Sequence, residues 1–240
     1  MKEEQQSTQK LQHKVLGLKL FLDKINIKKN LFRAMKYRKF YRKTSFKQKG
    51  IGEIFLNEVQ KTNPKSFFEI GIFHGVTARN VCDLMYKNHK SDFRYIGIDI
   101  FDENVNKNEI APSFRFNNVL KTFYFKYIKR QNPYSAIAVE DLLKKYKKNI
   151  EIITGNTNEK LKHLNLNNID YIFIDGGHNF EAVKNDLYYS KKFIRKGGTI
   201  LCDDYDLSYA PGVKKAIDEF VLNNQCKFSI IANRFAKIEL

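Results

Sequence analysis

The sequence predicts an α/β protein built on a mostly parallel sheet. Two apolar stretches, 171–174 and 199–202, each run into acidic residues, and a helix-like segment joins them. An apolar stretch followed by a glycine turn and a helix-like segment gives the same order near residue 70. Right-handed crossovers bring the carboxyl ends of such strands to one edge of the sheet, where open α/β sheets bind their ligands.

The composition fits one α/β domain with an appendage. Hydrophobic residues make up 42% of the 240 residues, and no apolar run is long enough to span a bilayer. The first residues lack the basic-then-apolar order of a signal peptide. Cys82, Cys202 and Cys226 form no metal-ligand or redox pair, which indicates thiols in a reducing compartment. We therefore expect a cytoplasmic protein, with peripheral attachment to a membrane as an option.

The positive charge is concentrated in the first 49 residues. Residues 1–49 hold fifteen Lys and Arg against three acids, so +12 of the net +17 lies there. Apolar residues at helical spacing form one stripe within it: Leu11, Val15, Leu18, Leu22 and Ile25. We interpret 1–49 as a basic helical arm on a domain of residues 50–240. The arm's partner is the domain itself, a second subunit, an anionic membrane surface or RNA. RNA is the least favoured of these partners, because a nucleic-acid groove would place the positive charge around the ligand-binding edge and not in the arm.

The first strand leads into a glycine turn. A strand ends at Glu69, Gly71 and Gly75 follow, and a helix starts near Thr77. Glycines let the backbone approach a ligand closely, and a helix N-terminus offers free N–H groups. The next strand ends at Asp99, where an acid can accept hydrogen bonds from both ribose hydroxyls. A simple turn residue at that position is the alternative.

A long insertion separates the second and third strands. Residues 102–149 exceed an ordinary connection and are rich in aromatic and basic side chains. We expect helices near 117–130 and 138–148, forming a lid or a wall of the substrate site.

The remaining elements follow in a regular order. Gly155 and Asn156 close the third strand, and Pro211 begins a helix. The expected elements are strand 150–154, helix 157–163, strand 170–175, helix 179–194 stopped by Gly197-Gly198, helix 211–222, and a hairpin of strands 227–232 and 235–240.

Polar residues follow the fourth and fifth strands. Asp175 and His178 come after one strand, and Asp203 and Asp204 after the other. Adjacent parallel strands would bring them into one crevice with three oxygen ligands and one group that titrates near neutrality. Cap and turn roles for all four are the alternative.

Together these motifs resemble the class I S-adenosylmethionine-dependent methyltransferases, in the branch that reads Asp-Gly-x-His, Gly-Gly-x-Ile and Asp-Asp. The resemblance covers roughly residues 60–240 and implies a Rossmann-like sheet of seven strands, mostly parallel, with a C-terminal antiparallel hairpin. It implies that the cofactor's amino-acid end lies near Glu69 and its adenine near Asn156. The cofactor-binding residues implied are Glu69, Gly71, Gly75, Thr77, Asp99, Asn156 and Asp175.

Catechol-type and macrolide-sugar relatives place a divalent metal at positions matching Asp175, Asp203 and Asp204. Oxygen ligands without sulfur suit Mg²⁺. By this resemblance His178 is the catalytic base and the substrate is a hydroxyl of a small molecule or glycan. The alternatives are a metal-independent methyltransferase that acts on RNA or another acidic substrate, and a non-catalytic binding protein with the methyltransferase fold. A nicotinamide oxidoreductase would need Gly-x-Gly-x-x-Gly at the first turn, and the chain lacks it.

Overall fold

The computed structural model describes residues 36–101 and 118–240. The compact unit that contains the sheet comprises Tyr37–Leu240. The predicted helical stripe between Leu11 and Ile25 lies outside the described residues, as does the first part of the insertion. Within the described part of the chain, no helix is both long and apolar enough to cross a bilayer.

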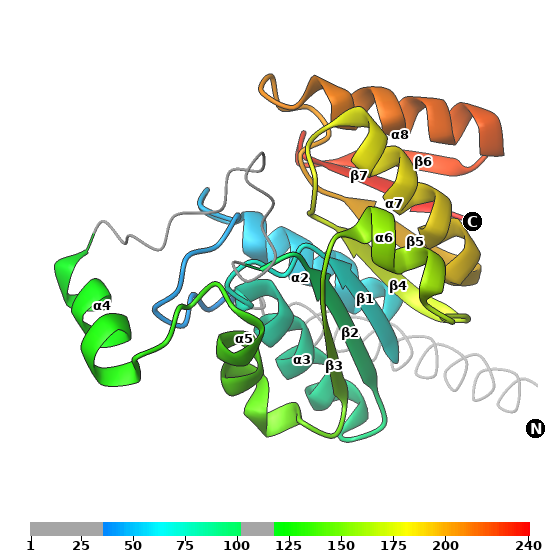
Figure 1. Ribbon diagram of the computed structural model, residues 1–240. Helices are drawn as coiled ribbons and strands as arrows, with labels where there is room; N and C mark the ends of the chain where they lie inside the picture. The colour runs from blue at the N-terminus through cyan, green and yellow to red at the C-terminus, as the bar shows by residue number, and fades with distance from the viewer. Residues whose placement is uncertain (1–35, 102–117) are drawn as a thin grey trace, which may run out of the picture. The chain divides into compact units, whose positions relative to one another are not determined.

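A seven-stranded sheet of order β3-β2-β1-β4-β5-β7-β6 forms the centre of this unit (Figure 1). The strands β1 to β5 are parallel, and β7 pairs antiparallel with both β5 and β6. The predicted seven-stranded, mostly parallel sheet with a C-terminal hairpin is therefore confirmed. The strands are β1 (Ser66–Ile70), β2 (Arg94–Asp99), β3 (Ile150–Thr154), β4 (Ile169–Ile174), β5 (Ile194–Cys202), β6 (Lys227–Ile231) and β7 (Phe235–Glu239).

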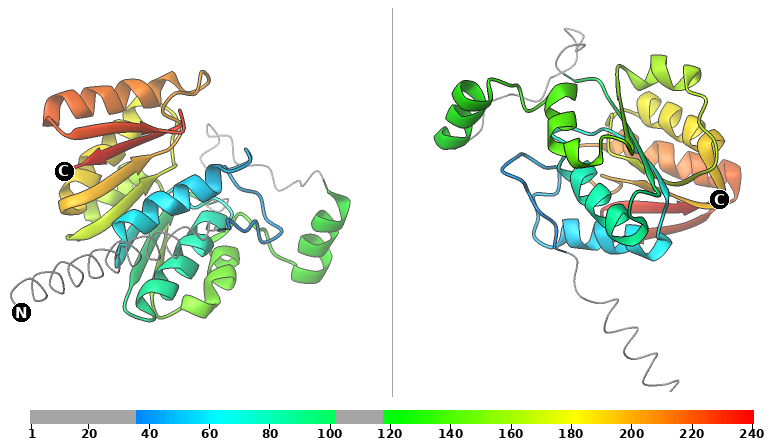
Figure 2. Two further views of the ribbon diagram at one scale, coloured as in Figure 1. Left: turned by 180° about the vertical axis from the view of Figure 1, so that it is seen from behind. Right: turned by 90° about the horizontal axis from the view of Figure 1, so that it is seen from below.

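Helices cover both faces of the sheet. Figure 1 has α7 in front of the strands, and the view from behind in Figure 2 brings α2 to the front. One side carries α2 (Ile51–Thr62), α3 (Val76–His89) and α5 (Ala136–Leu143); the other carries α6 (Thr157–Lys160), α7 (Phe180–Phe193) and α8 (Pro211–Asn224). The described part of the insertion adds α4 (Val119–Phe123), which continues as the π-helical η2 (Tyr124–Lys129).

The segment before α2 belongs to the core. The Phe46 side chain is 1% exposed, and its ring centroid lies 5.2 Å from that of Phe55 and 5.6 Å from that of Phe235. Burying such a ring stabilises the fold by roughly 1.5–3 kcal/mol. Residues 37–49, which the sequence assigned to the basic arm, therefore pack with the sheet domain. The sequence did not predict this packing, because a single buried aromatic residue among many lysines produces no periodic pattern.

The start of β5 differs from the expectation. The glycine pair was expected to stop the helix, but α7 ends at Phe193 and β5 begins at Ile194. The five-residue step from Ile194 to Thr199 lies opposite a two-residue step on β4. This bulge takes up the extra residues, and Gly197, with φ 73°, lies inside it.

Substitution of Gly71 tests the importance of the close approach between the chain after β1 and the chain after β4. The φ of Gly71 is 92°, and a Cβ there would lie 2.1 Å from the carbonyl oxygen of Asp175. Gly50 has a similar φ of 86° with open space around it. We expect Gly50→Ala to cost only the backbone strain, about 1–2 kcal/mol, and Gly71→Ala to cost clearly more. Urea unfolding followed by circular dichroism measures both, and equal losses would contradict the role of the close approach.

Candidate active site

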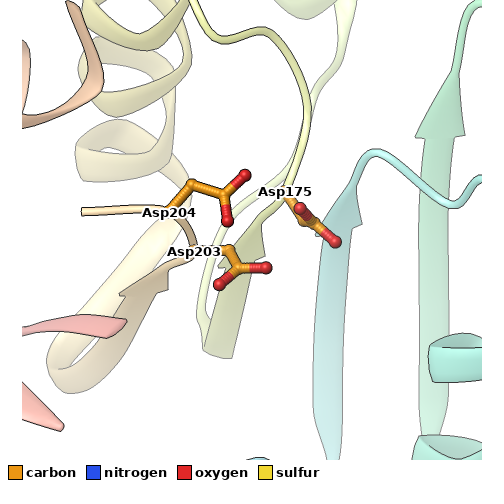
Figure 3. A group of neighbouring side chains, drawn as sticks. All are labelled: Asp175, Asp203 and Asp204. Carbon is orange, nitrogen blue, oxygen red and sulfur yellow. The ribbon is translucent and has the colours of Figure 1, made fainter. Parts of the chain in front are cut away.

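Three acids meet at the carboxyl ends of β4 and β5 (Figure 3). Asp175 directly follows β4, and Asp203 and Asp204 directly follow β5. Each of the three offers an oxygen within 4.8 Å of the others. The strand register explains this, since Ile174 pairs with Cys202 just before the acids begin. The expected pairing of two adjacent parallel strands thus brings the three carboxylates together.

His178 lies beside this cluster, on the turn between β4 and α7. Its Nε2 is 2.9 Å from Oδ2 of Asp204, and its side chain is 53% exposed. The hydrogen bond to Asp204 raises the pKa of His178 above its usual value. Tyr209 donates its hydroxyl to the same Asp204 oxygen, at 3.2 Å. The imidazole is therefore held by a carboxylate on one side and open to solvent on the other.

Arg234 provides a positive charge that the sequence analysis missed. From the turn between β6 and β7, its Nε donates to Oδ1 of Asp203 and its Nη2 to Oδ2, each at 2.5 Å. Nη2 also lies 3.4 Å from Oδ1 of Asp204. Nothing local in the sequence marks this arginine, because the pairing depends on the hairpin folding back against β5.

Burial and mutual repulsion govern the charges of the cluster. Burial raises the pKa of Asp175 well above its usual value, and the nearby charges of Asp203 and Asp204 raise it further. The Ser45 hydroxyl donates to Oδ2 of Asp175 at 2.9 Å and opposes this rise. The pKa of Asp203 is also raised by burial, against the hydrogen bonds from Arg234. Protein donors therefore offset part of the repulsion.

The first glycine turn lies next to the cluster. Glu69 is 1% exposed and accepts a hydrogen bond from the Tyr95 hydroxyl. Burial raises the pKa of Glu69 to about 8, so its carboxyl group is mostly protonated at neutral pH. The freedom of Gly71 serves the backbone of Asp175, which passes against it. Glu69 and Gly71 thus have structural partners within the chain.

Asp99 ends β2 in a ring of donors. One of its oxygens accepts from the backbone N–H of Phe73 at 2.7 Å. The other accepts from the N–H of Phe101 at 3.1 Å and from the Tyr134 hydroxyl at 2.8 Å. Tyr134 comes from the insertion, so this part of the chain contacts the predicted ribose site directly.

The other predicted cofactor residues cap helices or contact the segment before α2. Gly75 is the N-cap of α3 with φ 74°, and the Thr77 hydroxyl bonds to that of Tyr37 at 2.8 Å. Asn156 caps α6 by accepting from the N–H of Asn158 at 2.9 Å. Gly75 and Thr77 lie at the start of α3, which follows β1, and Asn156 lies at the start of α6, which follows β3.

Arg42 is a second functional candidate that the sequence did not reveal. It is 6% exposed and donates to the carbonyl oxygens of His74, Pro133 and Ala138, at 3.2, 3.4 and 2.8 Å. Burial lowers its pKa to about 10. One buried guanidinium therefore ties the segment before α2 to the first glycine turn and to the insertion.

Comparison with known proteins gives the family. A methyltransferase-domain family model matches residues 68–205, which is more than half of the chain. The chain belongs to this methyltransferase family.

Individual proteins are also similar to this chain. The uncharacterized protein R132 of Acanthamoeba polyphaga mimivirus is 30% identical over 179 residues, which cover 69% of the methyltransferase and 66% of R132, just under two thirds of its length. Among solved structures, an O-methyltransferase from Bacillus cereus in complex with SAH has a TM-score of 0.56 at 13% identity, covering 90% of this chain and 87% of that one. The O-methyltransferase NovP has a TM-score of 0.60 at 16% identity, covering 79% and 80%. The chain thus shares the fold of these two O-methyltransferases.

Glu69 gives the methyltransferase a defined pH response. Its folded pKa of about 8 lies above the usual 4.5, so between these values the unfolded chain releases a proton that the folded chain keeps. The free energy of unfolding therefore falls as pH rises through this window. We expect the melting temperature of Glu69→Gln, relative to the wild type, to rise between about pH 5 and about pH 9.

Asp170→Asn is the matched control for this measurement. Hydrogen bonds, foremost from Arg195, outweigh burial and hold the pKa of Asp170 below 3.8, so its stabilisation is fully present above that value. The melting temperature of this variant, relative to the wild type, should stay constant over the same window. A pH-independent difference for Glu69→Gln would contradict the raised pKa.

Proposed function

We propose that this methyltransferase transfers a methyl group from S-adenosylmethionine to a hydroxyl oxygen of a small molecule or sugar. The observation that carries the proposal is the grouping of His178 with Asp175, Asp203 and Asp204 at the ligand-binding edge of the sheet. When bound, S-adenosylmethionine supplies an electrophilic methyl sulfonium, so the protein needs mainly to align the acceptor oxygen and remove its proton.

His178 is suited to removing that proton. If its Nε2–H is donated to Asp204, Nδ1 is the nitrogen that accepts the hydroxyl proton. Asp204 orients the ring and stabilises the imidazolium that forms. The raised pKa of His178, caused chiefly by the hydrogen bond that it donates to Asp204, strengthens it as a base. The exposed side of the ring gives a substrate access to it.

The cofactor would lie along the ends of β1, β2 and β4. A carboxylate has about four acceptor positions, and protein donors occupy at least three of those on Asp99. A ribose hydroxyl would bind Asp99 by sharing these positions or by replacing the Tyr134 hydroxyl. Glu69, Gly71, Gly75 and Thr77 would border the amino-acid end.

Asn156 and Asp175 complete the proposed cofactor contacts. Asn156 is half-buried at the end of β3, where it would border the adenine. Asp175 is the first residue after β4; it belongs to the acidic cluster, and its backbone lies against the first glycine turn.

A divalent ion is proposed as a further component. The three carboxylates, without sulfur or nitrogen donors among them, fit the hard oxygen ligands that Mg²⁺ prefers. Such an ion would lower the pKa of a coordinated substrate hydroxyl. Asp175, Asp203 and Asp204 would hold it. The charge balance weighs against a strict requirement, because Arg234 already neutralises part of the cluster.

The alternatives are less well supported. A polyanionic RNA would meet three carboxylates beside the proposed base, and their repulsion disfavours it. A binding protein without activity would have no need for a histidine oriented by a buried carboxylate.

Binding of S-adenosylhomocysteine tests the proposal. We expect the wild type to bind it by calorimetry and Asp99→Ala to weaken binding by roughly 1–3 kcal/mol, since the ribose hydroxyls lose their acceptor. Asp92→Ala, which changes an exposed acid paired with Lys65, should bind like the wild type. Binding of NADH without S-adenosylhomocysteine would overturn the assignment.

His178→Gln complements this measurement. It should keep the affinity for S-adenosylhomocysteine, because the imidazole acts on the acceptor, and slow methyl transfer to a panel of phenols and sugars by roughly a hundredfold. Unchanged turnover would exclude His178 as the base.

A further inference from the structure

Arg234 is built into the acidic cluster. Two of its nitrogens donate side by side to the two oxygens of Asp203, which is the fork geometry that arginine and carboxylate share. The Asp203 side chain is 0% exposed and that of Arg234 is 13% exposed, so water screens this pair little.

The surroundings fix Arg234 in this position. Its carbonyl oxygen accepts from the N–H of Tyr205 at 2.9 Å, which ties the hairpin turn to the residue after the acids. Its guanidinium lies 5.3 Å from the ring centroid of Phe46 and 5.7 Å from that of Phe235. The positive charge is therefore pre-organised beside the cluster rather than borne on a free surface chain.

This arrangement conflicts with metal binding at one ligand. Both oxygens of Asp203 are engaged by Arg234, whereas Asp175 accepts only the Ser45 hydroxyl among the described side chains. Oδ1 of Asp204 is buried and makes no hydrogen bond within the described residues. An ion that needs all three acids must take an oxygen of Asp203 from the guanidinium and tolerate its charge nearby.

We propose that Arg234 is the resident cation of this cluster and that it competes with a divalent ion for Asp203. Arg234 therefore sets how strongly the metal binds. Through this competition it also determines how far the proposed methyl transfer depends on the metal. The inference rests on the proposed function only for that last consequence.

Binding of Mn²⁺ alone tests the competition without substrate. Titration followed by electron paramagnetic resonance should give a dissociation constant at least tenfold lower for Arg234→Gln than for the wild type. Arg234→Lys, which keeps the charge but loses the fork, should fall between them. Arg195→Gln is the matched control, since Arg195 pairs with Asp170 at the opposite ends of β4 and β5, and it should bind Mn²⁺ like the wild type.

Two further readings complete the test. The apo Arg234→Gln protein should melt at a lower temperature, because its acids repel each other, and Mn²⁺ should raise that temperature more than it does for the wild type. Retained S-adenosylhomocysteine binding checks that the variant is folded. Equal Mn²⁺ affinity of the wild type and Arg234→Gln would overturn the proposal, while loss of S-adenosylhomocysteine binding in the wild type would instead overturn the proposed function.

A second surface carries an independent inference. In α4 and η2, two rows of apolar residues at a spacing of four face solvent, and Val119, Leu120 and Ile128 are 82%, 79% and 65% exposed. We call this the α4–η2 face; its members are Val119, Leu120, Phe123, Tyr124, Tyr127 and Ile128. Phe125, by contrast, is buried and lies under the guanidinium of Arg42.

The charged residues within the segment that carries the α4–η2 face are all basic, although Lys129 pairs with Asp141 of α5 at 2.8 Å. Lys121, Lys126, Lys129 and Arg130 lie on the same two elements or directly after them, and no Asp or Glu occurs between residues 118 and 139. A symmetric dimer through this face would place one basic segment against its own copy. Exposed aromatic and aliphatic side chains among lysines match an anionic lipid surface instead.

We infer that the α4–η2 face docks on an anionic membrane surface. Its link through Phe125 and Arg42 to the first glycine turn would hold the active site near the lipid headgroups. In sedimentation with phosphatidylserine vesicles, a full-length Phe123→Ser and Tyr127→Ser double variant should bind roughly tenfold more weakly than the wild type.

Tyr188→Ser is the matched control, because Tyr188 is 54% exposed on α7; it should bind like the wild type. Salt should weaken the binding, and neutral phosphatidylcholine vesicles should bind neither protein well. Unchanged binding of the double variant would overturn the inference. A wild-type dimer that dissociates in the double variant would assign the face to a second copy.

Discussion

Three crowded carboxylates at one sheet edge, two of them buried and that of Asp175 half-buried, need a counter-charge, and much of the structure around them meets that need. Asp175, Asp203 and Asp204 are neighbours because β4 and β5 are adjacent and in register. In a weakly polar environment their repulsion is strong. The β6–β7 hairpin brings Arg234 against Asp203, and the segment before α2 brings Ser45 against Asp175. The terminal hairpin is thus part of the site as well as the edge of the sheet.

The same edge couples the stability of the fold to the geometry of the site. Gly71 lets the backbone of Asp175 pass within contact of the first glycine turn. Phe46 anchors in the core, and Ser45 beside it reaches the cluster. The packing of Phe46 in the core therefore positions the Ser45 hydroxyl that donates to Asp175. A change in this part of the core would also move the carboxylates.

At the proposed cofactor site, the acid Asp99 is balanced by hydrogen-bond donors and not by a counter-charge. Asp99 is already satisfied by two backbone donors and Tyr134, and Arg42 clamps the neighbouring turn to the insertion. A ligand that uses Asp99 must share or replace these bonds, so its affinity depends on how easily Tyr134 yields. The insertion is in this way linked to cofactor binding as well as to the substrate side.

The sequence alone determined the succession of strands and helices, the acids at the strand ends and the family resemblance, because apolar stretches, glycine turns and strand-end acids are local patterns. It could not place Arg234 on Asp203, Tyr134 on Asp99 or Phe46 in the core. Those contacts join residues 31, 35 and more positions apart, and nothing periodic marks them. The local sequence determined which side chains follow the strands at this sheet edge. The antiparallel register of β5 and β7 and the packing of the segment before α2 determined which groups contact the three acids.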